Sequence, residues 1–122
     1  MTNGVVVMAL ATTAQVAGDT RQFRLSPNVK RYTLMDTGFK KTNKGGFELE
    51  RSLDLNSPFT SNTKLKVLVN ADLDKLSMAV TTANGLRAVD IFKSDKTAGN
   101  VEQFNYVLND LLQRQVLEQV TD

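Results

Sequence analysis

The chain has 122 residues, of which 41% are hydrophobic and 23% charged, and this suits a single domain with one core. Its formal net charge of +2 is too small to indicate a nucleic-acid or membrane-surface protein by itself. The sequence contains neither His nor Cys, which excludes Ser-His-Asp and Cys-His nucleophiles, imidazole or thiolate metal ligands, and disulfides. We therefore expect a protein that is not an enzyme and that has no metal site and no cofactor.

The apolar run near the N-terminus is short. Val5 to Ala11 spans seven residues with no basic region before it, so it is a poor secretory signal and too short to cross a bilayer. The sequence thus predicts a cytoplasmic protein with no membrane partner. Residues 1–7 are either an extension upstream of a start at Met8 or the beginning of a first strand, and residues 8–122 are predicted to form one domain.

The first predicted elements are a strand pair and a short helix. Gly18-Asp19 has the composition of a two-residue hairpin turn, which joins a strand near residues 8–17 to one at 20–25. This turn places Ala14 opposite Phe23.

A helix near residues 27–36 is predicted to follow. Ser26 is a good N-cap and Pro27 suits the first helical position, where its missing N–H costs little. Gly38 can adopt the left-handed conformation that ends such a helix, and Phe39 would then fold back onto its last turn.

Two turn-rich segments organise the middle of the chain. Residues 43–45 (Asn-Lys-Gly) fit a three-residue hairpin loop, which places Lys40 opposite Glu48. Residues 56–63 are rich in turn formers and form the longest predicted loop.

Two further turns define a three-stranded antiparallel patch. Asn84-Gly85 is a strong hairpin signal that pairs the second strand of the patch with the third. A loop at residues 71–74 independently pairs the first strand with the second, and the two turns agree on which side chains share a face. The register brings apolar side chains to one face and polar ones to the other. The apolar face comprises Leu65, Val67, Val69, Leu76, Met78, Val80, Val89 and Ile91.

The C-terminal segment is predicted to cover that patch. From Asn100 to about Gln115, apolar residues recur at helical spacing, and Asn100 is a suitable cap. Residues 116–120 either continue the helix or form an edge strand. The fold class is therefore α+β: an antiparallel β-meander sheet with one face covered by a long C-terminal helix, plus the short helix near residues 27–36.

Basic residues concentrate between positions 21 and 44, where the sequence has seven basic residues and one acidic residue. This region is either an anion-binding or acidic-partner surface or an ordinary solvated face. Few aromatic residues accompany it, which disfavours nucleic acid as the partner. The seven candidates are Arg21, Arg24, Lys30, Arg31, Lys40, Lys41 and Lys44.

The carboxylates offer two candidate groupings. Glu48 and Glu50 lie two apart on one predicted strand, where we expect surface neighbours paired with nearby cations rather than an acid–base pair. Asp90 lies in mid-strand, where it either pairs with Lys66 or lines a small pocket with it on the second face of the sheet.

Four stretches carry a resemblance to a known family. Residues 26–34 (SPNVKRYTL), 36–39 (DTGF), 54–58 (DLNSP) and 84–92 (NGLRAVDIF) resemble domain of unknown function 1831, and the similarity runs from about Met8 to the end. The resemblance implies a role in amino-acid metabolism and a gene neighbourhood of cysteine desulfurase and sulfur transfer. The family has no catalytic motif, so no residue inherits a catalytic role.

These observations favour one function over two alternatives. We expect a non-catalytic accessory or regulatory protein whose partner is another protein, an enzyme of amino-acid or sulfur (cysteine) metabolism. The first alternative is anion or nucleic-acid binding through residues 21–44. The second is a small-ligand carrier with a pocket between sheet and helix or on the face that carries Asp90.

Overall fold

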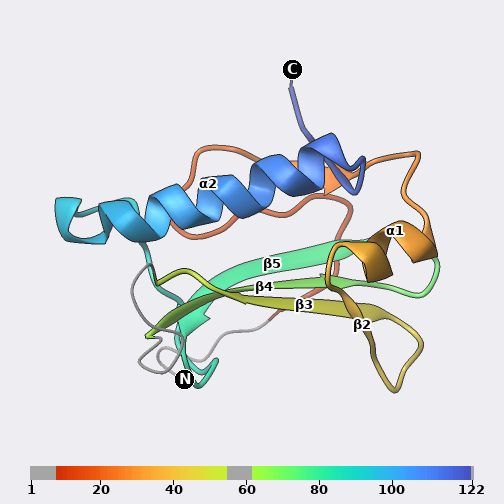
Figure 1. Cartoon of the computed structure of the whole chain (residues 1–122), viewed down its shortest axis with the longest axis horizontal. Helices are drawn as coiled ribbons and strands as arrows, with labels where there is room; N and C mark the ends of the chain where they lie inside the picture. Colours follow the sequence, from red (N-terminus) through yellow and green to blue (C-terminus); the bar gives the residue numbers. More distant parts are fainter. Residues whose placement is uncertain (1–7, 55–61, 122) are drawn as a thin grey trace.

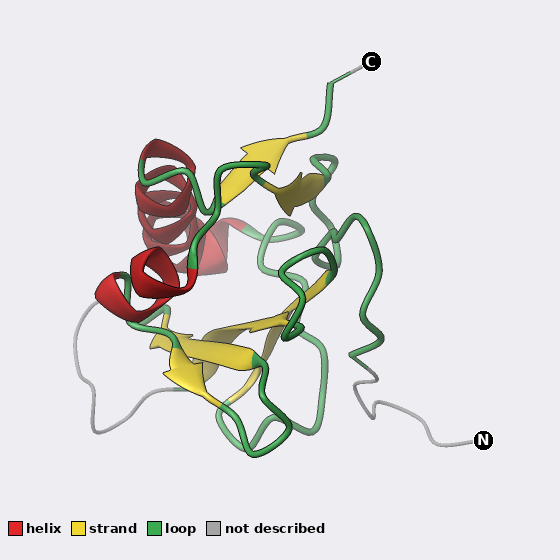
Figure 2. Ribbon diagram, turned by 90° about the vertical axis from the view of Figure 1, so that its right-hand side faces the viewer, coloured by secondary structure: helices red, strands yellow, loops and turns green. Residues whose placement is uncertain are grey.

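The computed structural model describes residues 8–54 and 62–121. A four-stranded antiparallel sheet of order β2-β3-β4-β5 lies beneath the long helix α2 (Ala98–Gln113), as Figure 1 shows. A separate two-stranded sheet of β1 and β6 lies apart from it, on the other side of the molecule in Figure 2. The predicted α+β fold, a meander with one face under a C-terminal helix, is confirmed.

Two expectations from the sequence concern residues outside this description. The assignment of residues 1–7 as an extension or first strand falls there entirely. The loop predicted over residues 56–63 falls there except for its last two residues, of which Thr63 already belongs to β4.

The four-stranded sheet has the register that its turns predict. Leu65 lies opposite Val80 and Val67 opposite Met78, and Lys40 lies opposite Glu48 at the first hairpin. Four strands form it: β2 (Lys40–Lys41), β3 (Phe47–Ser52), β4 (Thr63–Val69) and β5 (Leu76–Thr82).

The strand predicted after Asn84-Gly85 is nearly absent. It reduces to a bridge between Ala88 and Thr81 and a hydrogen bond of 2.9 Å from Val89 N–H to the Val80 carbonyl. The Asp90 carboxylate then accepts the Phe92 N–H at 2.8 Å, an Asx turn that leads the chain away from the sheet. β3 instead provides the third long strand, on the other side of β4.

The strand predicted over residues 8–17 is also wrong, although one of its pairings is right. Ala14 bridges Phe23 as predicted, but Ala11 bridges Leu76 on β5. Because the segment pairs with a different sheet at each of these points, it cannot form a continuous ladder with either.

Helix α1 (Arg31–Asp36) begins four residues later than predicted. The Ser26 hydroxyl accepts the Asn28 N–H at 3.1 Å, so this local cap closes a turn rather than a helix. The end is as predicted: Gly38 has φ +105°, and the Phe39 N–H donates back into the last helical turn at 3.0 Å.

Helix α2 follows a short 3₁₀ turn, η2 (Asp95–Thr97), so the predicted cap at Asn100 is wrong. The Asn100 amide instead donates to the Leu53 carbonyl at 2.8 Å and to Asp54 Oδ1 at 3.0 Å, which ties the helix to the end of β3. The predicted apolar stripe is confirmed, and its buried members are Phe104, Val107, Leu108 and Leu111.

The end of α2 resolves the alternatives for residues 116–120. Gln115 adopts φ +59° and the Val116 N–H donates to the Leu111 carbonyl at 2.9 Å, a Schellman-type end without glycine. The chain then forms β6 (Leu117–Gln119), which pairs with β1 (Phe23–Leu25). This segment is therefore an edge strand.

The Arg21 guanidinium links the segment before β1 to α2. The Arg21 side chain pairs with the buried Asp19 carboxylate at 3.0 Å and donates to Asn105 Oδ1 at 2.9 Å. It also lies over the rings of Phe23 and Phe104, 5.6 and 5.7 Å from their centroids. Arg21 is thus part of the internal packing.

We predict that Gln115→Gly stabilises the protein by about 0.5–1 kcal/mol, because a left-handed conformation is strained for a residue with a Cβ. Urea denaturation measures the free energy of unfolding. Arg114→Gly, at φ −82°, is the matched control and should lose stability. A loss of stability in Gln115→Gly would refute the strain argument.

We predict that Arg21→Ala lowers the free energy of unfolding by about 1.5–3 kcal/mol, because it removes the guanidinium that pairs with a buried carboxylate and packs on two rings. Arg24→Ala is the control: Arg24 forms an exposed ion pair with Glu118, whose loss costs about 1 kcal/mol at most. Equal losses in the two variants would show that the Arg21 contacts do not stabilise the fold.

Candidate functional site: an apolar groove on the outer face of the sheet

The sheet face turned away from α2, here the outer face, carries a network of paired charges. Lys64 Nζ lies 3.3 Å from Glu50, and Lys66 Nζ lies 3.6 Å from Glu48 and 3.7 Å from Glu50. The two glutamates are therefore surface carboxylates neutralised by neighbouring cations, as the sequence predicts. The cations that pair with them come from β4.

Leu68 interrupts this charged face. Side chains of β4 alternate between the two faces of the sheet, so Leu68 points outward like Lys64 and Lys66. In the pairing of β3 with β4, it lies opposite Glu48. Its side chain is only partly buried. Sequence reasoning missed this residue, although an apolar residue in the outward phase of a charged strand is the signal that identifies it.

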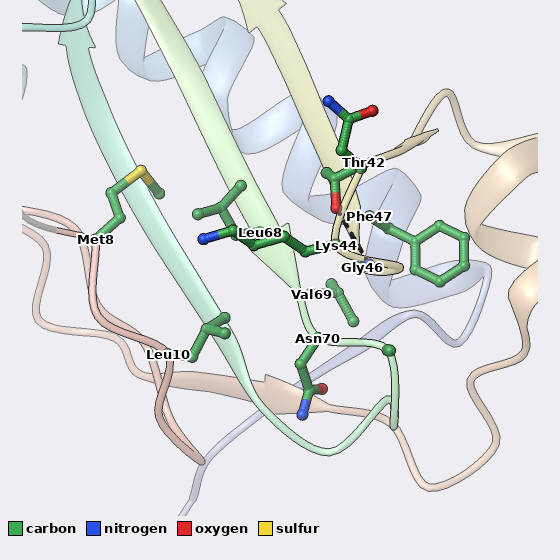
Figure 3. A pocket seen from close by; sticks show the side chains of 11 residues that line it. Met8, Leu10, Thr42, Lys44, Gly46, Phe47, Leu68, Val69 and Asn70 are labelled. Atoms are coloured by element: carbon green, nitrogen blue, oxygen red, sulfur yellow. Dashed lines mark hydrogen bonds between the residues drawn. The ribbon is translucent and has the colours of Figure 1, made fainter.

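A groove of about 500 Å³ surrounds Leu68, within the range of ligand pockets, and is open to solvent on one side. In Figure 3, Met8 and Leu10 form one wall beside β5, and the loop between β2 and β3 forms the other. Leu10 is 44% exposed. We call this site the outer-face groove, and it is lined by Met8, Leu10, Thr42, Asn43, Lys44, Gly46, Phe47, Leu68, Val69, Asn70 and Ala71.

Backbone pairing holds the first wall in place. Ala11 and Leu76 exchange two hydrogen bonds of 2.9 and 2.8 Å, which fix the N-terminal segment against the edge of β5. Met8 and Leu10 immediately precede this bridge. The groove therefore depends on a contact between residues 65 positions apart (76 − 11).

Hydrogen bonds and glycine shape the second wall. Thr42 N–H donates to the Gly46 carbonyl at 2.9 Å, and Thr42 Oγ1 accepts the Gly46 N–H at 3.1 Å. A Cβ at Gly46 would lie 2.6 Å from the Val69 carbonyl oxygen, so only glycine lets the loop approach β4 this closely.

The hairpin wall and its neighbouring turn carry cations. Lys44 lines the groove and, in Figure 3, extends from the loop toward Leu68. The Arg31 guanidinium donates to the carbonyl of Ala71, another lining residue, at 3.0 Å. A Cβ placed on Gly45 would lie 3.7 Å from Ala71 Cβ, so loop and turn are in contact. Lys44 and Arg31 thus both border this end of the groove.

The structure divides the seven predicted basic candidates among several places. Arg21 is held inside the fold by Asp19, and Arg24 pairs with Glu118 at the two-stranded sheet. Lys30 is the exposed N-cap residue of α1. Lys40 and Lys41 are exposed on β2, the strand that leads into the groove loop.

The two residues of the predicted pocket have separate surroundings. Lys66 belongs to the ion-pair network with Glu48 and Glu50. Asp90 packs against Gly18, where an added Cβ would lie 2.1 Å from its Oδ1 atom. Leu68 lines the outer-face groove, and neither Lys66 nor Asp90 does.

The ranges that the structure describes are residues 8–54 and 62–121. They contain no group of three or more Asp or Glu side chains placed to hold a metal ion. They also contain no helix whose length and hydropathy would allow it to span a membrane.

Comparisons with known proteins agree on one family. The DUF1831 family model, described as "Putative amino acid metabolism", matches residues 8–118. The crystal structure of a DUF1831 family protein from Lactobacillus plantarum has 46% sequence identity and a TM-score of 0.85, covering 93% of this chain and 100% of that one. No curated protein matches this chain. This chain belongs to the DUF1831 family.

Proposed function

We propose that this protein is a cytoplasmic, non-catalytic accessory protein that docks on a partner protein through the outer-face groove. The partner that we propose is an enzyme of amino-acid or sulfur (cysteine) metabolism. The description of the family supports the metabolic assignment. The observation that carries the docking proposal is Leu68, an apolar residue among the charged side chains of β3 and β4 on the outer face, with an exposed Leu10 beside it.

The energetics favour a partner at this site. Burying apolar surface contributes roughly 25 cal/mol per Å², and the side chains that contribute most are those covered at the centre of an interface. Leu68 already has walls around it, so a partner side chain inserted there would be covered on several sides. The paired lysines and glutamates nearby form a polar surround of the kind found at interface rims.

Docking is better supported than anion or nucleic-acid binding through residues 21–44. Arg21 and Arg24 are engaged with Asp19 and Glu118, so two of the seven cations are occupied within the fold. Of the remaining cations, Lys44 lines an apolar groove and Arg31 donates to its lining residue Ala71, whereas single-stranded nucleic acid needs exposed rings on which bases stack.

Site-specific cross-linking in the native host tests this proposal. We predict that a benzophenone amino acid at position 10, in the groove wall, forms one discrete adduct with an enzyme. The same group at position 86 is the control, because Leu86 is also exposed, at 57%, but does not line the groove.

Two results would contradict docking through the groove. One is the absence of any protein adduct from position 10 at native expression. The other is the same adduct from positions 10 and 86 in equal yield, which would report random encounters. A Leu68→Asp change should abolish the adduct from position 10, because it places a charge in the apolar floor.

A further inference from the structure

We infer that the element that docks in the outer-face groove is an extended acidic segment of the partner, with an apolar side chain seated on Leu68 and carboxylates beside Lys44 and Arg31. This inference rests on the proposed function and adds the chemistry of the partner. It follows from the different character of the two walls of the groove.

The floor and the N-terminal wall select an apolar side chain. Leu68, Met8 and Leu10 contribute hydrocarbon and a thioether to this part of the groove. Two polar groups of the lining already have partners in the fold. Thr42 Oγ1 accepts the Gly46 N–H, and Asn70 Oδ1 accepts the N–H groups of residues 74 and 75 at 3.0 Å each. The groove therefore offers packing rather than hydrogen bonding to what it holds.

The hairpin end of the groove selects negative charge. None of the ion pairs between described residues involves Arg31, Lys44 or Lys75. Of the five donor N–H groups of the Arg31 guanidinium, one hydrogen-bonds to Ala71, which leaves donors for a carboxylate.

The acids near the groove only partly offset these cations. Glu48, opposite Leu68, is neutralised by Lys66. Asp74 accepts the Asn70 amide, and Asp72 is a further acid in the same turn. Arg31 and Lys44, with Lys75 at the end of the same turn, leave an excess of positive charge over Asp72 and Asp74 at this end, which favours acidic residues in the partner.

The shape of the groove favours a chain segment over a free small molecule. The groove is open on one side, and its two walls come from separate segments, near residues 8–10 and 42–46. Its cations are distributed over the β2–β3 loop and α1 rather than converging on one point. Several carboxylates spaced along a backbone match this distribution better than one carboxylate does.

Binding of blocked synthetic peptides to the ¹⁵N-labelled full chain tests the inference. The first peptide has a Leu-Phe core between runs of Glu, the second has the same core between runs of Lys, and the third has Ala-Ala between runs of Glu. We expect the first to shift the backbone amides of Leu68 and Ala71 and to bind at least about tenfold more tightly than the others.

A pair of charge-reversal variants provides the matched control. Lys44→Glu should weaken the first peptide by about threefold or more, whereas Lys96→Glu, the same change on the exposed turn η2, should leave its affinity unchanged. Both lysines are exposed, so neither change should disturb the fold.

Several outcomes would overturn the inference without touching the proposed function. These are no binding of the first peptide, equal binding of the lysine-flanked peptide, or equal weakening by the two variants. Equal or tighter binding of free 4-methylpentanoate at the same amides would instead indicate a small-molecule site. The cross-linking from position 10 decides independently whether a protein docks in the groove.

Discussion

The strict alternation of β4 is the constraint on which the rest of the structure depends. Leu65 and Val67 are fully buried beneath α2, the helix above the sheet in Figure 1. Lys64 precedes Leu65 and Lys66 lies between the two, and both lysines point to the outer face. A shift of one residue in the register would place lysines under the helix, which would cost far more than any loop rearrangement. This alternation therefore sets the register of β3 and β5 on either side.

The same alternation produces the candidate site. Because the inner face of β4 is occupied by core residues, Leu68 is left on the side where lysines and glutamates pair. The glycines of the β2–β3 loop and the bridge between Ala11 and Leu76 then build walls around it. The fold thus carries an apolar recess with a cationic end, and this is the site at which we propose that a partner docks.

Local signals predicted the register of β4 and β5 but neither the third long strand of the sheet nor the groove. The turn at Asn84-Gly85 and the alternating strands give the correct register, because both depend on neighbouring residues. The helix starts were wrong for two reasons. Ser26 closes a local turn with Asn28 instead of capping a helix, and Asn100 bonds to Leu53 and Asp54, which no local pattern indicates. The N-terminal wall of the groove depends on the long-range bridge between Ala11 and Leu76, which no spacing in the sequence indicates.

The most direct test compares two leucines on the same strand. Leu65→Ala should lower the free energy of unfolding by about 2–5 kcal/mol, because it opens a cavity beneath α2. Leu68→Ala should lower it by only about 1 kcal/mol, because this side chain is partly exposed on the outer face. Urea denaturation of both variants measures the difference. Equal losses would contradict the division of β4 into a core face and an outer face.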